Sequence, residues 1–355
     1  MDYPYPILEK VFEYYNKIPH KVGEIFLVGC QHLLEPQMKM FEYLIKFGFN
    51  PKKIIMLGKA YSTNNEIVEE LNKIGIQAIQ PKFSGINFDE EHRENCRMLF
   101  NLVNSDAEIV IMDDGAELIR TFVGSGRRIN FGVEQTSSGF RLLKDNDLGF
   151  PVFNVARSAT KLNQESPLVA RHLCERIFNY FQSKNILNPN ILIVGLGPIG
   201  EAILEVLKEH NLLVEGFDIK YGHSDLLTKI CDLKPNVIIG ATGSTIITKE
   251  DLETISLTHD VFLISASSSD REFPVVSFRD NQGVHEDVIY KNFIFVNNGF
   301  PFSFMGNRHE MTPMEIEKTM CLLSGSIMHG VVKGAHGSGL LEIPKELEDI
   351  INQSD

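Results

Sequence analysis

The sequence predicts an α/β protein built from two doubly wound parallel sheets, one in each half of the chain. Short apolar runs rich in β-branched residues alternate with segments whose apolar residues recur every three or four positions. Near-continuous apolar strands joined by helices indicate parallel sheets covered on both faces. A glycine-rich turn then follows a strand halfway along the chain and opens a second series of strands.

The composition is that of a soluble globular protein, since 43% of the 355 residues are hydrophobic and 23% are charged. The formal net charge of −13 argues against nucleic acid or an anionic membrane as the main partner, because both require clustered Lys and Arg. The five cysteines lie far apart without a C-x-x-C pair, so neither a disulfide framework nor a metal site is expected. Such scattered cysteines favour a reducing cytoplasm. No signal peptide or membrane-spanning run is evident.

The elements follow in order along the chain. In the first half, strands are expected at 24–30, 53–58, 108–113, 128–134 and 151–156, and helices at 36–48, 64–75 and 89–104. A long helix is expected at 167–183, and KNILNPN after it is interpreted as a connection. The second half has expected strands at 191–195, 212–218, 236–240, 261–266 and 293–299. A last helix is expected from Thr312, where Thr312-Pro313-Met314-Glu315 matches a capping box. The segment 328–339 is interpreted as a flexible loop.

The glycine-rich turn has the context of a dinucleotide-binding motif. It reads Gly195-Leu196-Gly197-Pro198-Ile199-Gly200, directly after the apolar strand 191–194 and before the helical run EAILEVLKEH. The first glycine permits the tight turn, the second lets the backbone approach the pyrophosphate, and the third lets helix pack on strand. The helix start then presents its N–H groups to the phosphates.

Asp218 closes the next strand, near the spacing expected for a carboxylate on the adenosine ribose. Without an arginine nearby it favours NAD over NADP. The alternative is a glycine turn in a Rossmann-like domain that has lost its ligand. Only 17 residues separate Asp218 from the strand at Asn236, so the adenine side of the cofactor site is expected to be trimmed.

Five other stretches precede this motif: GCQHLLE (29–35), YSTNNE (61–66), IMDDGAEL (111–118), VEQTSSGFRLL (133–143) and NVARSATK (154–161). Their order and spacing resemble the S-adenosylhomocysteine hydrolase family, over about residues 29 to 349. The resemblance implies a substrate-binding domain at 1–166, rejoined by 310–355, an NAD-binding Rossmann domain at 167–309, and a cleft between them. The family's C-terminal tail is missing, so the homo-oligomer that the resemblance implies is expected to be a dimer.

The resemblance implies a particular chemistry. In the family, NAD oxidises the 3′-hydroxyl of a nucleoside thioether, the thiol leaves by elimination, water adds, and the ketone is reduced again. Four residues match catalytic positions: His32, Asp114, Lys161 and Glu165. Lys161 would act at the 3′-hydroxyl, with Glu165 in place of an aspartate. Asp113 is an alternative to Asp114, and each residue also has a purely structural interpretation, such as a surface Lys–Glu pair or an acidic turn.

Other positions match the family's binding residues. Those expected to contact the cofactor are Thr136, Ser137, Ser138, Thr242 and Ser303, besides the glycine motif and Asp218. Those expected to contact substrate are Gln135, Ser268 and His309. Gln135 replaces a family glutamate, Ser268 falls where the family has a histidine, and His309 lies one residue out of register. Groups tied to NAD are therefore kept while groups tied to adenosine are changed, which shifts specificity.

Three functions follow from this pattern. The first is an NAD-dependent, adenosylhomocysteinase-like enzyme acting on a small nucleoside-type substrate by transient 3′-oxidation, with hydrolysis, dehydration or epimerisation as the outcome. The second is a non-catalytic relative that binds NAD or a nucleoside. The third is a plain NAD-dependent dehydrogenase that releases NADH.

Overall fold

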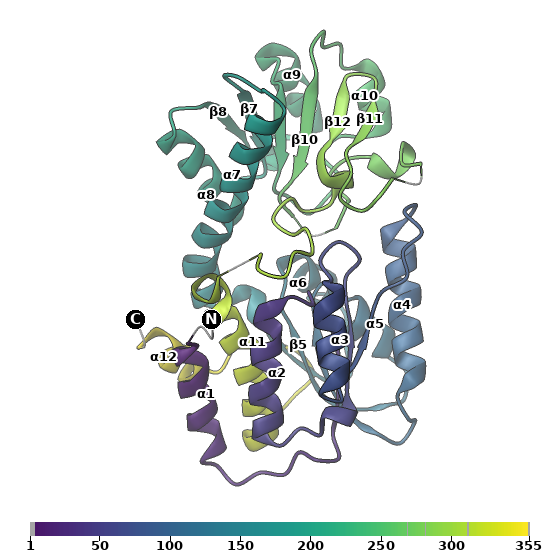
Figure 1. Cartoon of the computed structure of the whole chain (residues 1–355), viewed down its shortest axis with the longest axis vertical. Coiled ribbons are helices and arrows are strands. Elements are labelled where there is room, and N and C mark those ends of the chain that lie inside the picture. Colours follow the sequence, from purple (N-terminus) through teal and green to yellow (C-terminus); the bar gives the residue numbers. More distant parts are fainter. Residues whose placement is uncertain (1–3, 268, 281, 311, 354–355) are drawn as a thin grey trace. The chain divides into compact units, whose positions relative to one another are not determined.

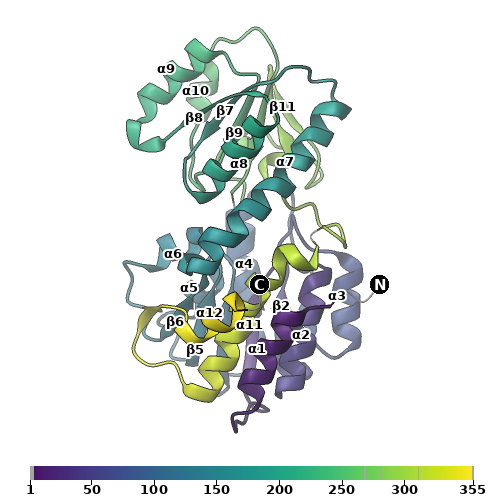
Figure 2. The ribbon, with the colours of Figure 1, turned by 90° about the vertical axis from the view of Figure 1, so that its left-hand side faces the viewer.

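The computed structural model describes residues 4–267, 269–280, 282–310 and 312–353, which divide into two compact units (Figures 1 and 2). Unit 1 comprises Met1–Lys82, Glu90–Glu165 and Gly306–Asp355, and unit 2 comprises Phe83–Asp89 and Ser166–Met305. Each unit is a parallel-dominated sheet covered by helices on both faces. The predicted fold class is therefore confirmed. None of the helices in these ranges combines the length and hydrophobicity needed to cross a membrane.

Unit 1 contains a seven-stranded parallel sheet in the order β13-β6-β5-β4-β1-β2-β3. Its strands are β1 (Phe26–Cys30), β2 (Ile54–Leu57), β3 (Gln77–Ile79), β4 (Glu108–Asp113), β5 (Arg128–Glu134), β6 (Pro151–Asn154) and β13 (Gly339–Leu341). The central strands are apolar on both faces, as the sequence pattern predicts for a covered parallel sheet. The edge strands β3 and β13 were not predicted, since each is only three residues long.

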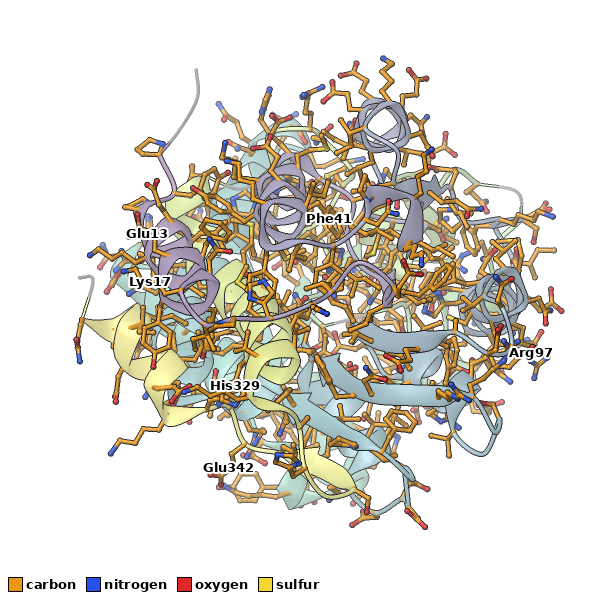
Figure 3. All side chains as sticks on the ribbon, turned by 90° about the horizontal axis from the view of Figure 1, so that it is seen from below. Glu13, Lys17, Phe41, Arg97, His329 and Glu342 are labelled. Atoms are coloured by element: carbon orange, nitrogen blue, oxygen red, sulfur yellow. The ribbon has the colours of Figure 1, made fainter. Side chains whose placement is uncertain are left out.

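Helices cover both faces of this sheet. They are α1 (Pro6–Asn16), α2 (Glu35–Phe47), α3 (Asn65–Lys73), α4 (Phe88–Leu102), α5 (Glu117–Phe122), α6 (Ser137–Leu143), α11 (Pro313–Lys333) and α12 (Lys345–Asn352). α4 and α5 bury Leu99 and Ile119 against one face. In Figure 3, Phe41 of α2 lies in the interior, whereas Glu13, Lys17 and Arg97 extend outward.

Residues 328–333, expected to belong to a flexible loop, form the last turns of α11. Gly330 allows this helix to lie against the ring of Phe131 in β5, where a Cβ atom would come within 2.6 Å of ring carbon Cε1. His329, one residue earlier, contacts Glu346 of α12 at 3.1 Å. For residues 328–333 the interpretation as a loop was wrong, because Gly330 serves close packing of helix on sheet, whereas residues 334–338 lie outside any helix or strand.

Unit 2 contains a six-stranded sheet in the order β11-β12-β10-β9-β7-β8, parallel except for the β11–β12 pair. Its strands are β7 (Asn190–Val194), β8 (Leu213–Phe217), β9 (Val237–Gly240), β10 (Val261–Ser265), β11 (Val288–Tyr290) and β12 (Phe293–Phe295). Helices α7 (Ser166–Ser183) and α8 (Pro198–Glu209) cover one face, and α9 (His223–Leu233) and α10 (Lys249–Thr254) cover the other.

The strand expected at 293–299 ends at Phe295, and a helical turn at Val296–Gly299 follows it. Asn297 and Asn298 adopt left-handed φ angles of 55° and 54°, a conformation that asparagine tolerates better than most residues. The chain therefore turns where the apolar pattern predicted extension.

Segment 83–89 packs with unit 2, although both of its flanks belong to unit 1. The Arg279 guanidinium donates a hydrogen bond to the Ile86 carbonyl oxygen at 3.1 Å. The rings of Phe83 and Phe88 both contact Phe300, with centroids 5.7 and 5.4 Å apart respectively. The sequence pattern gave no sign of this excursion.

Candidate functional site

The sheet of unit 1 has a topological switch point between β1 and β4. From β1 the strand order runs to β2 and β3 on one side, and the chain then returns to β4, β5 and β6 on the other. Ligands of open α/β sheets bind outside the carboxyl ends of the strands at such a point. His32 stands two residues beyond β1, and Asp114 stands one residue beyond β4.

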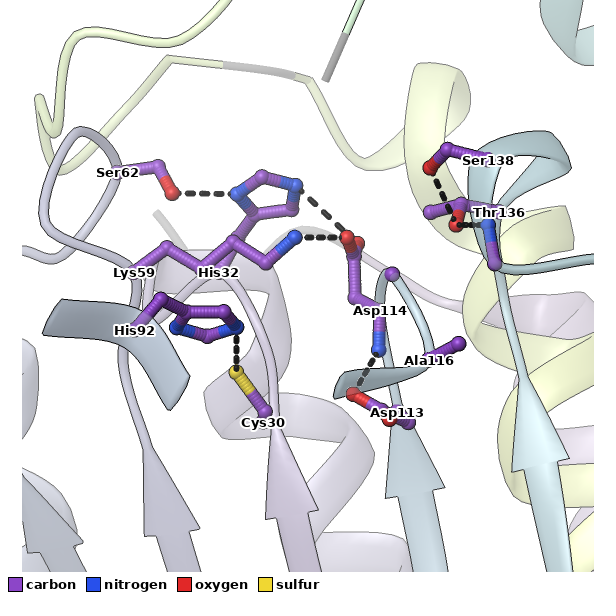
Figure 4. A network of polar contacts seen from close by, with 12 residues as sticks. Cys30, His32, Lys59, Ser62, His92, Asp113, Asp114, Ala116, Thr136 and Ser138 are labelled. Atoms are coloured by element: carbon purple, nitrogen blue, oxygen red, sulfur yellow. Dashed lines mark hydrogen bonds and ion pairs between the residues drawn. The ribbon is translucent and has the colours of Figure 1, made fainter. Parts of the chain in front are cut away.

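The structure brings these two predicted residues together (Figure 4). His32 Nε2 lies 3.3 Å from Asp114 Oδ2, and His32 Nδ1 is hydrogen-bonded to the Ser62 hydroxyl. The other carboxylate oxygen of Asp114, Oδ1, forms an ion pair with the Lys59 ammonium group. All four side chains are buried. The result is a network of one cation, one carboxylate, one imidazole and one hydroxyl at the switch point.

The charges of Asp114 and Lys59 stabilise each other. Burial alone would raise the pKa of the Asp114 carboxyl, but the Lys59 ammonium and the His32 ring hold it well below its usual range. Burial alone would lower the pKa of the Lys59 ammonium, but Asp114 raises it well above its ordinary value. Asp114 is therefore a carboxylate and Lys59 a cation over the physiological pH range.

Asp113, the alternative to Asp114, contacts backbone N–H groups and not His32. Its carboxylate accepts hydrogen bonds from the backbone N–H groups of Asp114 and Ile119, each at 2.8 Å, and its side chain is fully buried. Asp113 thus holds the start of α5 in place. Asp114 is the aspartate that faces His32.

Glu134, at the end of β5, ties the adjacent loops together. Its carboxylate accepts from the backbone N–H groups of Gly115 at 3.1 Å and Ala116 at 2.9 Å, and from the N–H and hydroxyl of Thr136, both at 2.7 Å. Burial raises the pKa of this carboxyl to about 7. Glu134 was not assigned a role from the sequence, although it directly precedes Gln135.

Thr136, Ser137 and Ser138 follow at the start of α6. The Thr136 hydroxyl accepts from Gly139 N–H at 3.0 Å and so caps the helix, while the Ser138 hydroxyl lies 3.0 Å from it. Ser137 is exposed. The contact of these hydroxyl groups with a cofactor stays a prediction.

Three amide side chains at the carboxyl ends of the unit 1 strands have a buried polar atom without a hydrogen-bond partner within the described residues. These atoms are Gln31 Nε2, Gln135 Oε1 and Asn154 Oδ1. Their residues follow β1 and β5 or end β6. A buried polar atom without a partner is costly, so each requires an explanation, and a ligand supplies one. Sequence reasoning identified Gln135 but not Gln31, Asn154 or Lys59. The signal that could have found them is their place within two residues of a strand's carboxyl end.

The remaining predicted residues of unit 1 lie in different settings. Lys161 begins a π-helical turn, Lys161–Glu165, a rare conformation that often occurs at functional sites. The Lys161 side chain is half-buried, and its backbone N–H donates to the Ser158 hydroxyl at 3.2 Å. His309 is exposed, beside Arg308, which pairs with Glu35, Glu66 and Glu70. The Glu165 side chain and Ser268 lie outside the part of the chain that the structure describes.

In unit 2 the switch point lies between β7 and β9, where the glycine motif leaves β7. Gly195 has a φ of 101°, and a Cβ atom there would lie 2.7 Å from Thr242 Cγ2. A Cβ on Gly200 would overlap the Gly195 carbonyl oxygen. Gly197, by contrast, is exposed, with no atom of the described residues within 4 Å of the Cβ position, and Pro198 and Ile199 begin α8 after it. The first and third glycines are thus required by the fold, and the second leaves its backbone open to a phosphate.

The other predicted cofactor residues lie around this turn. Asp218 accepts from the Lys220 N–H at 2.9 Å and lies 3.4 Å from the Lys220 ammonium, a cation that the sequence argument for NAD over NADP did not consider. The Thr242 N–H donates to the buried carboxylate of Glu272 at 2.6 Å, which also accepts from the Ser265 hydroxyl at 2.7 Å. Ser303 is buried. Nowhere in the described ranges do three or more potential ligands gather into a metal site.

Comparisons with known proteins give a broader setting. No family model matches the chain. Two uncharacterized proteins of Mycobacterium tuberculosis, from strain CDC 1551/Oshkosh and strain H37Rv, are each 32% identical to it over 343 residues. The alignments cover 87% of this chain but 64% of each relative, so the chain spans less than two thirds of their length.

Solved structures with a similar chain path include dipicolinate synthase from Bacillus subtilis, with a TM-score of 0.32 and 11% identity over 71% of this chain and 83% of that one. The dipicolinate synthase from Bacillus halodurans has a TM-score of 0.35 and 10% identity, over 71% and 85%. Phosphoglycerate oxidoreductase from Vibrio cholerae O395 has a TM-score of 0.34 and 11% identity, over 69% and 76%. Scores this low carry no argument about the fold or the activity of this chain. The sheet order and glycine turn themselves define the chain as a Rossmann-like α/β protein.

Proposed function

We propose that this protein is an NAD-dependent enzyme with adenosylhomocysteinase-like chemistry. It acts on a nucleoside or nucleoside thioether by transient oxidation of the 3′-hydroxyl, elimination or addition at the neighbouring carbons, and re-reduction. The observation that supports this most is the contact between His32 and Asp114 at the switch point of unit 1. Two residues selected by resemblance, from separate strands, meet where a parallel sheet binds ligands.

Unit 2 would hold the cofactor. The Gly195–Gly200 turn and the start of α8 would take the pyrophosphate, Asp218 the adenosine ribose, and Thr242 and Ser303 the nicotinamide end. The space at Gly197 supports this fit, because a phosphate needs close approach of the backbone there. NAD, when bound, supplies a reversible hydride acceptor for a carbon that bears a hydroxyl group.

Unit 1 would hold the substrate. Lys161 takes the proton from the 3′-hydroxyl and returns it at the end of the cycle, and Glu165 positions Lys161. His32 and Asp114 serve the neighbouring carbon acid and the leaving group. Gln135, whose Oε1 has no hydrogen-bond partner among the described residues, accepts from a sugar hydroxyl. A neutral amide suits a hydroxyl partner, which supports a polyhydroxylated substrate.

Deuterium exchange tests this function directly. The purified protein is incubated with NAD and either adenosine or S-adenosylhomocysteine in deuterated water, and C4′ is examined by proton NMR. We expect deuterium at C4′ without net accumulation of NADH. Lys161→Ala should abolish the exchange and keep NAD affinity. The matched control is Lys144→Ala, which removes an exposed lysine of the same unit that pairs with Asp145.

The other two functions give different results. Net NADH formation without exchange would identify a plain dehydrogenase. NAD binding without exchange in any nucleoside tested would identify a non-catalytic relative. The observation that favours this second candidate is Gln135, which lacks the charge of the family glutamate. Exchange that survives in Lys161→Ala would overturn the role of Lys161.

A further inference from the structure

The turn after β2 delivers two side chains to the His32–Asp114 pair. Its shape is fixed by Gly58, where a Cβ atom would lie 2.9 Å from Thr63 Cγ2, and by the Lys59 carbonyl oxygen. That oxygen accepts from the Ser62 N–H at 3.0 Å and from the Thr63 hydroxyl at 2.7 Å. The closed turn places the Lys59 ammonium on Asp114 and the Ser62 hydroxyl on His32 (Figure 4).

We propose that Lys59 and Ser62 are positioning residues, and that Lys59 keeps Asp114 a carboxylate that receives a hydrogen bond from substrate instead of taking a proton. The placement stands on the geometry of unit 1. The part that concerns substrate rests on the proposed function.

The two oxygens of Asp114 have different surroundings. Oδ1 is occupied by Lys59, whereas Oδ2 is buried without a well-aligned hydrogen bond from any described residue, although the His32 ring lies 3.3 Å away. A carboxylate accepts several hydrogen bonds, so Oδ2 has capacity for a substrate hydroxyl. The ammonium on Oδ1 makes the same carboxylate a poor proton acceptor, because protonation would leave Lys59 buried without a countercharge.

The different surroundings of the two oxygens assign different tasks to Asp114 and His32. Asp114 orients substrate, and His32 is the member that can gain and lose a proton. The Ser62 hydroxyl suits that task, because it can donate to a bare Nδ1 or accept from a protonated one. It therefore serves His32 in both protonation states and holds the ring in place.

The groups around Asp114 agree with a fixed negative charge. Lys59 and Tyr61 face it from the turn after β2, His32 from β1, and Glu134 from β5, while Asp113 precedes it on β4. Burial raises the pKa of Asp113 well above its ordinary value, and that of Glu134 as well. Burial therefore disfavours a negative charge on Asp113 and Glu134, whereas the contact with Lys59 favours one on Asp114.

The test is to follow the carboxyl carbon of Asp114 by NMR as pH is lowered. In the wild-type protein its chemical shift should not reach a midpoint in the ordinary aspartate range. K59M should raise the midpoint by about 1–3 pH units, because it removes an opposite charge in contact with the carboxylate. K59R should keep the low value. Lys53→Met is the matched control, since Lys53 pairs with Glu24 at the other end of β2.

An ordinary midpoint for Asp114 in the wild-type protein would overturn the proposal, and so would an unchanged midpoint in K59M. If K59M does not fold, the wild-type and K59R titrations still decide. On the acid side of the pH profile, K59M should also lose C4′ exchange at a higher pH than the wild type does. Absence of exchange in the wild type with a low Asp114 midpoint would refute the reaction and leave the charge assignment in place.

Discussion

Gly200 lies so close to Gly195 that a Cβ atom on Gly200 would overlap the Gly195 carbonyl oxygen. The same turn leaves Gly197 open, since no atom in the described part of the chain lies within 4 Å of its Cβ position. One glycine motif thus contains a position reserved for packing and a position that remains open at the surface. Alanine variants at the two sites should separate folding from cofactor binding.

Gly200→Ala should destabilise unit 2 by about 1–3 kcal/mol, because the added methyl forces the helix start away from the strand. Gly197→Ala should leave thermal unfolding unchanged, since its φ of −86° suits alanine and the space is free. It should weaken NAD binding about tenfold or more by blocking the approach of a phosphate. Differential scanning calorimetry measures the effect on unfolding, and isothermal titration calorimetry with NAD measures the effect on binding. Full NAD affinity in Gly197→Ala would contradict a phosphate at this turn.

Glu134 should make stability fall with rising pH. Burial raises the pKa of its carboxyl from 4.5 to about 7, so the folded state binds this proton more tightly than the unfolded state does. Stability from this group is full below pH 4.5 and is lost as pH rises to about 7, by about 3 kcal/mol. Urea denaturation at intervals across this range measures the slope.

Glu134→Gln should flatten this slope, although it lowers stability at every pH because an amide nitrogen meets backbone N–H donors. The control is Glu108→Gln, at the exposed start of the neighbouring strand β4. Equal slopes in the wild type and Glu134→Gln would assign the pH dependence to other groups.

Asp218 should determine the choice between NAD and NADP. Asp218→Asn removes a charged acceptor for the ribose hydroxyls, so NAD affinity should fall at least about tenfold. NADP should gain relative to NAD, because Lys220 is then left without its carboxylate partner. Lys220→Ala keeps the carboxylate and should leave NAD affinity nearly unchanged. Calorimetric titration with both dinucleotides decides, and an unchanged ratio in Asp218→Asn would remove Asp218 from the site.

Arg279 should hold segment 83–89 on unit 2. Its guanidinium is buried, pairs with Asp270 at 2.8 Å and lies over the rings of Phe83 and Phe300. Arg279→Met leaves Asp270 as a buried acid without its partner, which should cost about 3–5 kcal/mol and release the segment. Cleavage by trypsin after the exposed Lys82 should accelerate.

Arg271→Met is the comparison for this variant. Arg271 pairs with Asp89 at 2.8 Å, but both side chains are about one-third exposed, so the pair contributes about 0–1 kcal/mol. Trypsin should cleave this variant at nearly the wild-type rate. Similar rates in all three proteins would show that the aromatic contacts of Phe83 and Phe88 are sufficient to hold the segment.

The sequence predicted the sheets well because their strands are buried on both faces and therefore apolar throughout. β4, for example, was predicted with the bounds that the structure has, Glu108–Asp113. The short edge strand β13 lacks this signal, and Gly330 was misread because a glycine in a helix and one in a loop look alike in sequence. Long-range contacts such as Arg279 with Ile86 have no periodicity at all.

The site shows the same division. His32 and Asp114 could be selected because each lies in a recognisable motif beside a strand end. Lys59 could not, because a lysine after an apolar strand is ordinary until its burial and its partner are known. Burial of a charge depends on the packing of several strands, and a linear pattern does not contain that information.

The excursion of segment 83–89 and the late return at Gly306 mean that neither unit is a continuous stretch of polypeptide. During synthesis the ribosome completes all of unit 2 before it delivers α11 and β13 to unit 1. Unit 1 is therefore the first unit to be started and the last to be completed. Its sheet stays partly uncovered until the last fifty residues of unit 1, Gly306–Asp355, are synthesised. A nascent chain halted near Met305 would contain a complete unit 2 and an incomplete unit 1. The uncovered apolar surface of unit 1 is the kind of surface that chaperones bind.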